Sequence, residues 1–227
     1  MRAAGRGLAL FDLDDTLLPL DSDHAWGEFM VREGWVDAVE FKRANDAFYA
    51  DYRAGRLDIH AYVAFTTQPL RTRDAAVLAA AQERFMAEVI RPAIRPAALQ
   101  LVARHRDMGD TMALVTATND FVTAPIAVAL GIEPLIAVRL EREPGATITG
   151  RIDGTPSYRE GKVVRVEEWL ASGGLAWSDF ERISVYTDSV NDLALLERAT
   201  DPVATNPTPA LEAIASARGW RILKPYA

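Results

Sequence analysis

The first acidic cluster of the chain directly follows a short apolar run. Asp12, Asp14 and Asp15 come after residues 8–11, a run typical of a buried strand. Carboxylates at the exit of a buried strand are costly unless a cation or a reaction uses them. Asp12 and Asp14 are two positions apart, so both can reach the crevice where open α/β sheets bind ligands. An acidic turn that caps the next segment is the alternative interpretation.

A second polar cluster follows another apolar run. Asp188, Asn191 and Asp192 come after residues 183–186. An Asp or Ser after a strand often caps a helix, so this cluster alone is ambiguous. If both strands end at one pocket, however, the two clusters bring carboxylates together. Magnesium takes one or two protein carboxylates plus water and phosphate oxygens, so the sequence predicts a Mg²⁺ site.

Donors for a phosphate group occur at two further positions. Thr116 ends the apolar run 112–115, and Ala117 is expected to lie at the start of a helix, whose free N–H groups favour an anion. Lys162 follows Gly161 just before a helical stretch. Alone, Lys162 is typical of a surface lysine. Together with the two acidic clusters, these residues predict a phosphate-binding site.

Alternating strands and helices must position these residues. The predicted helices include 96–108, with Leu99 and Val102 on one buried face, 120–130, and one that opens at 208–209. This alternation predicts an α/β fold, a Rossmann-like three-layer core with a parallel sheet. The predicted strands are residues 8–11, 112–115, 135–138, 183–186, 202–204 and 221–223.

Residues 20–92 interrupt this alternation with helical periodicity alone. This stretch is too long for an ordinary crossover, so we expect an inserted all-helical cap domain at 20–92 and a catalytic core at 1–19 and 93–227. Its apolar stripes are most simply the cap's own core, with ligand binding as the alternative. The stripes are Trp26, Phe29 and Met30, and Val77, Leu78, Ala81, Phe85 and Val89. A small hairpin is expected at 138–154, around Pro144–Gly145.

Composition limits the chemistry further. The 227 residues carry 25 Lys and Arg against 32 Asp and Glu, a net charge of −7, which argues against non-specific binding to nucleic acid or anionic membranes. There is no cysteine, so thiolate chemistry is excluded and a metal must bind oxygen or imidazole. Apolar runs are shorter than the roughly 7–15 residues of a signal peptide or the about 20 of a membrane span. We therefore expect a cytoplasmic protein.

The motifs in their order resemble those of a known family. Asp12-x-Asp14-x-Thr16, then Thr116, then Lys162, then Asp188 with Asp192 four positions later resemble the haloacid dehalogenase superfamily of phosphohydrolases. The spacing is similar to the subclass of phosphoserine phosphatase, which has a helical cap between the first two motifs. The resemblance spans essentially the whole chain and implies a Mg²⁺-dependent phosphatase.

The resemblance also implies a role for each residue. Asp12 would attack phosphorus and form an aspartyl-phosphate, while Asp14 would act as general acid and then general base. Asp192 would orient Lys162 or a metal-bound water. The implied Mg²⁺ ligands are Asp12, the backbone carbonyl of Asp14, and Asp188, with Asn191 near the metal and phosphate. The implied phosphate-binding residues are Thr116, Ala117 and Lys162.

The leaving group is less well defined. Asp21 stands where phosphoserine phosphatases place a glutamate, and His24 would lie near the junction of cap and core. Both are candidate substrate residues, although Asp21 and Asp23 could equally cap a helix beginning near Ala25. We expect a small-molecule phosphate ester as partner, no nucleic acid, no membrane, and a monomer or homodimer.

Three other functions are compatible with parts of the sequence. Gly161-Lys162 resembles half of a P-loop, but Val163 stands where Ser or Thr must bind magnesium and Pro156 replaces the first glycine. A phosphotransferase or phosphomutase would keep the same nucleophile and remains an alternative. A catalytically silent interaction protein would be expected to have lost the nucleophile or the metal carboxylates, which are all present.

Overall fold

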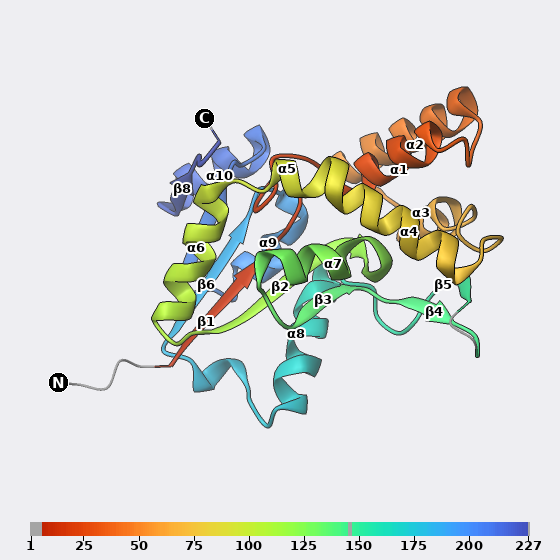
Figure 1. The fold of residues 1–227 in the computed structure, drawn as a ribbon. Helices are drawn as coiled ribbons and strands as arrows, with labels where there is room; N and C mark the ends of the chain where they lie inside the picture. The colour runs from red at the N-terminus through yellow and green to blue at the C-terminus, as the bar shows by residue number, and fades with distance from the viewer. Residues whose placement is uncertain (1–5, 145–146, 227) are drawn as a thin grey trace.

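Six parallel strands form the central sheet, in the order β3-β2-β1-β6-β7-β8 (Figure 1). This computed structural model describes residues 6–144 and 147–226. The strand order changes direction at β1, so the ends of β2, β1 and β6 lie beside a topological switch point. The strands are β1 (Gly7–Phe11), β2 (Thr111–Asn119), β3 (Leu135–Val138), β6 (Arg182–Thr187), β7 (Asp201–Thr205) and β8 (Arg221–Leu223).

Helices cover both faces of the sheet, and β1 shows why. Its side chains alternate, so Ala9 and Phe11 pack with α6 and α7 while Leu8 and Leu10 pack with α8, α9 and α10. This confirms the predicted α/β fold with three layers. The helices are α6 (Pro96–Asp107), α7 (Asp120–Leu130), α8 (Glu160–Ser172), α9 (Leu193–Leu196) and α10 (Pro209–Arg218), with short 3₁₀ turns at Trp177–Asp179 and Val190–Asp192.

A helical segment connects β1 to β2 and extends beyond the end of the sheet (Figure 1). Residues 20–92 are all described, and none forms a strand. Asp21, Asp37 and Asp58 each accept backbone N–H groups of the helix they precede, which fixes where α1, α2 and α3 begin. The segment contains α1 (Ser22–Arg32), α2 (Ala38–Arg53), α3 (Ile59–Thr66), α4 (Ala75–Phe85), a π-helical turn at Met86–Ile90, and α5 (Arg91–Ala93).

Aromatic side chains join this segment to the rest of the molecule. Trp26 lies with its ring centroid 5.2 Å from Phe29, 5.1 Å from Phe85 and 5.4 Å from Phe121 of α7. Most residues of the predicted stripes are therefore buried in packing, but Trp26 packs on α7 as well as within the helical segment. The domain boundaries at 19/20 and 92/93 remain a prediction.

Two residues predicted to be buried are exposed. Leu99 is 42% exposed and Val77 is 47% exposed. In α6 the buried positions are Ala98, Leu101, Val102 and His105, and in α4 they are Ala81 and Phe85, with Leu78 half-buried. These sets follow the i, i+3, i+4, i+7 spacing of one helix face, and Leu99 and Val77 fall one position outside it.

The end of β2 also differs from the prediction. Ala117 to Asn119 were expected to open a helix, but they continue the strand, and Asn119 pairs with Val138 of β3. The helix α7 begins one residue later, and the Asn119 side chain accepts the N–H of Val122. The strand persists because β3 still offers a pairing partner at Asn119.

The remaining predictions concern the hairpin and membrane association. β4 (Leu140–Arg142) pairs antiparallel with β5 (Ile148–Ile152), which confirms the hairpin; Gly145 of its predicted turn lies outside the described residues. In the part of the chain that the structure describes, no helix has the length and apolar character needed to cross a membrane.

Candidate active site

The carboxyl ends of β2, β1 and β6 meet at one edge of the sheet. Asp12 directly follows β1, Thr116 lies near the end of β2, and Asp188 directly follows β6. Lys162 lies in the first turn of α8, whose preceding loop brings it to the same edge. Neighbouring parallel strands thus place side chains from four distant parts of the sequence within contact range.

A buried lysine lies between two carboxylates. Lys162 Nζ donates hydrogen bonds to Asp12 Oδ1 at 2.9 Å and to Asp192 Oδ2 at 2.7 Å. Only 1% of Lys162 is exposed, and 6% of Asp12. Thr187 Oγ1 also donates to Asp192, at 2.7 Å, and so fixes that carboxylate. The three charged groups form one network from which water is largely excluded.

The charges in this network shift each other's pKa. Burial raises the pKa of Asp12 to about 7, although the neighbouring Lys162 acts in the opposite direction. Burial works to lower the pKa of Lys162, but Asp12 and Asp192 outweigh it and hold this pKa well above its usual value. Lys162 therefore stays charged at neutral pH and supplies fixed positive charge beside Asp12.

The Asp14 carboxyl is held by donors from three places. It accepts hydrogen bonds from the Ser22 N–H at 2.7 Å, from Thr118 Oγ1 at 2.8 Å and from Thr116 Oγ1 at 3.4 Å. Burial raises the pKa of Asp14 to about 7. A carboxyl group with such a pKa can both release and accept a proton near neutral pH.

The donor set at the predicted metal site suits a hard cation. Burial and the negative charge of Asp12 raise the pKa of Asp188 to about 9. Asp12 and Asp188 therefore lie close together without enough positive charge nearby to balance both carboxylates. Among the described residues, no three His, Cys, Asp or Glu side chains form a ready-made metal cage. The predicted set uses only two carboxylates and the Asp14 carbonyl, which matches the few protein oxygens that Mg²⁺ takes.

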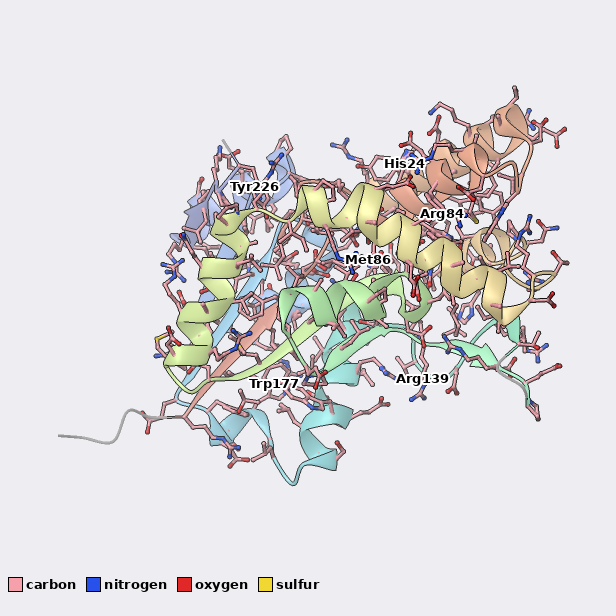
Figure 2. All side chains as sticks on the ribbon, viewed as in Figure 1. His24, Arg84, Met86, Arg139, Trp177 and Tyr226 are labelled. Carbon is pink, nitrogen blue, oxygen red and sulfur yellow. The ribbon has the colours of Figure 1, made fainter. Side chains whose placement is uncertain are left out.

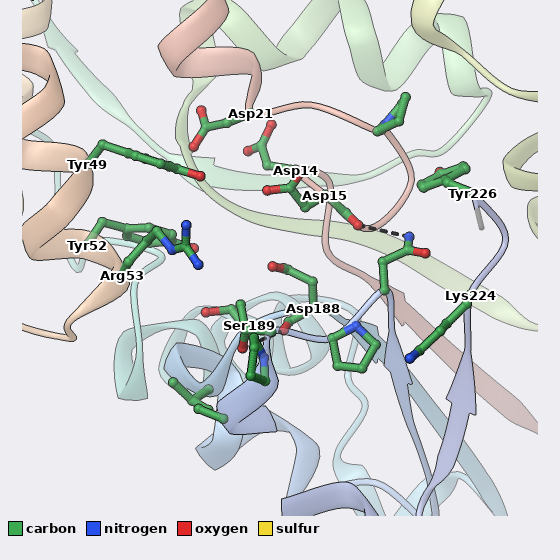
Figure 3. A pocket seen from close by; sticks show the side chains of 17 residues that line it. Asp14, Asp15, Asp21, Tyr49, Tyr52, Arg53, Asp188, Ser189, Lys224 and Tyr226 are labelled. Carbon is green, nitrogen blue, oxygen red and sulfur yellow. Dashed lines mark hydrogen bonds between the residues drawn. The ribbon is translucent and has the colours of Figure 1, made fainter. Parts of the chain in front are cut away.

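Two cavities open at this edge of the sheet. The larger, about 660 Å³, reaches from Asp14, Asp15 and Asp188 to Tyr226. In Figure 3, Tyr49, Tyr52 and Arg53 extend into view from one side of it, while Lys224 and Tyr226 stand on the other. The smaller, about 40 Å³, lies between the helical segment and the catalytic edge. It is lined by Asp12, Asp14, Asp21, Asp23, Phe48, Tyr49, Tyr52, Leu57, Ile59, Tyr62, Ala117 and Thr118.

The two candidate substrate residues, Asp21 and His24, lie in different surroundings. Asp21 lines both cavities, although its side chain also caps α1 by accepting the His24 N–H at 2.8 Å. His24 lines neither cavity, and its ring faces Asn45 and Asp46 of α2 at 3.4 and 3.8 Å. Figure 2 shows His24 beside α1 and α2, away from Tyr226. The structure therefore does not bring His24 to the catalytic edge.

Asn191 lies beside Asp192 and joins the helical segment to the catalytic edge. Its amide Nδ2 donates to the Tyr52 carbonyl at 3.0 Å, so it links the end of α2 to the turn after β6. Arg159 makes a parallel link, donating to the Gly55 carbonyl at 3.0 Å. Both contacts hold the α2–α3 turn against the catalytic edge.

Several residues of the site are not predicted from the sequence. Thr118 could have been predicted, because it lies two positions after Thr116 and therefore points to the same face of β2. Ser22 and Thr187 contribute through contacts to Asp14 and Asp192 that no local pattern reveals. The aromatic rings of the smaller cavity come from α2 and α3, and their placement depends on how these helices pack.

Comparisons with known proteins agree on the family. The model of the haloacid dehalogenase-like hydrolases matches residues 9–197. A histidinol-phosphatase of Neisseria meningitidis serogroup C (strain 8013) is 41% identical over 218 residues, covering 96% of this chain and 98% of the relative. A Bordetella pertussis Tohama I protein described as of unknown function has a crystal structure that is 50% identical, with a TM-score of 0.92 and 98% and 100% of the two chains covered.

A more distant structure supports the fold. A substrate-bound phosphoserine phosphatase is 18% identical, with a TM-score of 0.67 and coverage of 97% of this chain and 93% of that one. At this identity the likeness concerns the fold alone. The matched model covers most of the chain, including Asp12, Thr116, Lys162 and Asp188. The chain therefore belongs to the haloacid dehalogenase-like hydrolase family.

Proposed function

We propose that this chain is a phosphatase that hydrolyses small-molecule phosphate monoesters through an aspartyl-phosphate on Asp12. The observation that carries the proposal is the buried Lys162 ammonium, 2.9 Å from Asp12 and next to a cavity that Asp12 shares with Asp14. A nucleophile, an acid–base group and a fixed cation are the components that phosphoryl transfer needs. The 41% identical relative is also named as a phosphatase.

The first step transfers the phosphoryl group to the enzyme. An Asp12 oxygen attacks phosphorus while the bond from phosphorus to the ester oxygen breaks. Asp14, with a pKa raised to about 7, is protonated in about half of the molecules at neutral pH, and this form donates its proton to the departing oxygen. Lys162 lies within reach of the transferring group and stabilises its negative charge.

The second step regenerates the enzyme. Asp14 has lost its proton and now accepts one from a water molecule, whose oxygen attacks phosphorus. The bond between phosphorus and Asp12 breaks, which releases inorganic phosphate and restores the Asp12 carboxylate. Thr118 and the Ser22 N–H hold the Asp14 carboxyl in place through both steps. Asp14 can therefore act as the acid in the first step and as the base in the second.

Asp12, Asp188 and the Asp14 carbonyl are the residues that would hold Mg²⁺. When bound, this ion supplies positive charge that offsets repulsion between the carboxylates and the phosphate. The raised pKa of Asp188, caused by burial and by Asp12, supports a cation at this place. Asp188 therefore has a binding role in the proposal and takes no part in proton transfer.

Removal of divalent ions is expected to stop turnover. Treatment with EDTA followed by desalting should lower kcat with an aryl phosphate about 100-fold or more, since a catalytic cation supplies several kcal/mol. Added Mg²⁺ should restore the rate. Thermal unfolding before and after treatment controls for damage to the fold. Full activity in EDTA, with added Mg²⁺ making no difference, would contradict the metal assignment.

We further propose that the leaving group is cationic, with histidinol phosphate as the first candidate. Histidinol carries an ammonium group and an imidazole ring, and histidinol-phosphatase is the name of the 41% identical relative. Asp21 and Asp23 line the smaller cavity together with Asp12 and Asp14, among aromatic rings. Of the described residues that line this cavity, none is Lys or Arg. Burial raises the pKa of both Asp21 and Asp23 to about 7, and a bound cation would favour their charged forms. The cavity thus offers carboxylates and aromatic faces to a cationic group.

Substitution of Asp21 by asparagine tests this substrate class. Asn also caps helices well, so Asp21→Asn should leave α1 intact. We expect kcat/KM for histidinol phosphate to fall roughly 10- to 100-fold, since a hydrogen bond to a charged group is worth about 1.5–3 kcal/mol. Glycerol phosphate, whose leaving group is neutral, is the matched control. It reports the change that loss of the Asp21 charge makes to the pKa of Asp14, and its kcat/KM should fall less. An equal loss on both substrates would count against recognition of a cation by Asp21.

A further inference from the structure

The backbone that follows Asp14 is held by two side chains from the C-terminal part of the chain. Asn206 Nδ2 donates to the Asp15 carbonyl at 3.0 Å, the dashed line that ends on Asp15 in Figure 3. Tyr226 donates from its hydroxyl to the Thr16 carbonyl, also at 3.0 Å. Two successive carbonyls next to the proposed acid–base residue are therefore fixed from outside the loop.

Asp15 has a backbone conformation that makes such anchoring necessary. Its φ is +51°, in the left-handed region that residues other than glycine rarely adopt. This reversal turns the chain directly after Asp14, so the backbone of Asp15 helps to set the direction of the Asp14 carboxyl, which accepts from Thr118. A strained conformation persists only where its surroundings impose it. Here the Asp15 N–H donates to the Leu20 carbonyl within the loop at 3.2 Å, and Asn206 and Tyr226 hold the Asp15 and Thr16 carbonyls from outside.

The two anchors are themselves tied to the last strand of the sheet. Asn206 follows β7 and donates its backbone N–H to the Leu223 carbonyl of β8 at 2.8 Å. Tyr226 lies three residues beyond the end of β8. Both residues lie outside the stretch 9–197 that the family model matches. Asn206 and Tyr226 therefore support the loop after Asp14 from the C-terminal part of the chain.

From these contacts we infer that Asn206 and Tyr226 are positioning residues for Asp14. The inference rests on the proposed function, in which Asp14 protonates the leaving oxygen. Both side chains also line the larger cavity, but the donor atoms named here bond to loop carbonyls. They would act through the backbone of Asp15 and Thr16, and a small displacement of a catalytic group is enough to slow a reaction strongly.

The leaving group of the substrate distinguishes positioning of Asp14 from a general structural role. An alkyl phosphate such as glycerol phosphate needs a proton on its departing oxygen, whereas 2,4-dinitrophenyl phosphate releases a stable anion without one. The value of kcat/KM reports the steps up to cleavage of the ester bond. At Mg²⁺ concentrations that saturate each variant, a displaced Asp14 carboxyl should therefore lower kcat/KM for the alkyl ester and spare it for the dinitrophenyl ester.

The variants are Asn206→Gly and Tyr226→Phe. Asn206 has a φ of +46°, a conformation that glycine adopts readily, so Asn206→Gly removes the side-chain donor without straining the backbone. Tyr226→Phe removes only the hydroxyl group. We expect each variant to lose about tenfold in kcat/KM for glycerol phosphate, a fraction of what general acid catalysis contributes. The value for 2,4-dinitrophenyl phosphate should stay within about twofold of wild type.

A control variant loosens the same tail without touching the loop. Lys224 pairs with Glu212 of α10 at 2.7 Å, and Glu212→Gln weakens that pair. Its ratio of kcat/KM values for the two substrates should match that of the wild type. Thermal unfolding checks that each variant folds; Asn206→Asp, which keeps the side-chain size and replaces the donor by an acceptor, stands in if Asn206→Gly does not.

The outcomes separate the two levels of the proposal. Equal losses on both substrates, or no loss on either, would overturn positioning of Asp14 while leaving the phosphatase proposal intact. A wild-type protein that hydrolyses neither ester in Mg²⁺ would overturn the proposed function, and the inference with it. A selective loss on glycerol phosphate in both variants, absent from Glu212→Gln, supports it.

Discussion

Substitution of Asp12 by asparagine is expected to lower kcat with any phosphate ester by about 10⁴-fold or more, the scale seen when a catalytic nucleophile is removed. The amide oxygen is a poor nucleophile and cannot form the aspartyl-phosphate. The variant keeps the shape of the side chain, so binding of phosphate should suffer less than turnover. The measurement is steady-state hydrolysis of an aryl phosphate in Mg²⁺.

The fold of this variant should not be weakened. Asp12→Asn removes a buried carboxylate whose pKa is raised by burial, and Lys162 keeps its hydrogen bond to Asp192 at 2.7 Å. We therefore expect a thermal unfolding midpoint equal to or above that of the wild type. Activity close to wild type in Asp12→Asn would refute Asp12 as the nucleophile.

Replacement of Lys162 by methionine should damage both stability and activity. The variant leaves Asp12 and Asp192 buried without their common cation, and breaking a buried ion pair in this way typically costs about 3–5 kcal/mol. Loss of a fixed donor for the transferring phosphoryl group should also lower kcat by about 10²–10³-fold. Urea unfolding and steady-state kinetics measure the two effects separately.

Lys42 offers a matched control for this substitution. It pairs with Asp46 on the surface of α2 at 3.2 Å, and its side chain is 63% exposed. Lys42→Met should change the free energy of unfolding by at most about 1 kcal/mol, because exposed ion pairs contribute little. If Lys162→Met and Lys42→Met had the same free energy of unfolding, the ion pairs of Lys162 would not contribute the stability proposed for them.

The catalytic edge could be found in the sequence because its signal is local. Asp12 and Asp188 each directly follow an apolar strand, and parallel strands end at a common edge, so these two could be expected to meet. Lys162, 150 positions from Asp12, follows no strand and could be expected there only in combination with the other motifs. The order of strands, however, required the structure. So did the second partner of Lys162, since the sequence left Asp192 between orienting Lys162 and orienting a water.

The residues that line the cavities and anchor the loop after Asp14 could not be predicted, because their positions depend on tertiary packing. His24 and Asp21 are three positions apart in one helical turn, yet Asp21 faces the cavities while His24 faces α2. Tyr49 and Tyr62 come from different helices, and only the packing of α2 on α3 brings both to the smaller cavity. Tyr226 reaches Thr16 across 210 positions, and nothing in its neighbourhood in the sequence suggests this contact.

The most direct test of the central claim is to trap the phosphorylated enzyme. Wild-type protein turning over a phosphate ester in Mg²⁺ is quenched in acid, digested, and its peptides are measured by mass spectrometry. We expect the added mass of one phosphoryl group on the peptide that contains Asp12, and its absence in Asp12→Asn. A phosphoryl group on another residue, or turnover by an enzyme that carries none in acid-quenched single-turnover samples, would contradict the aspartyl-phosphate mechanism.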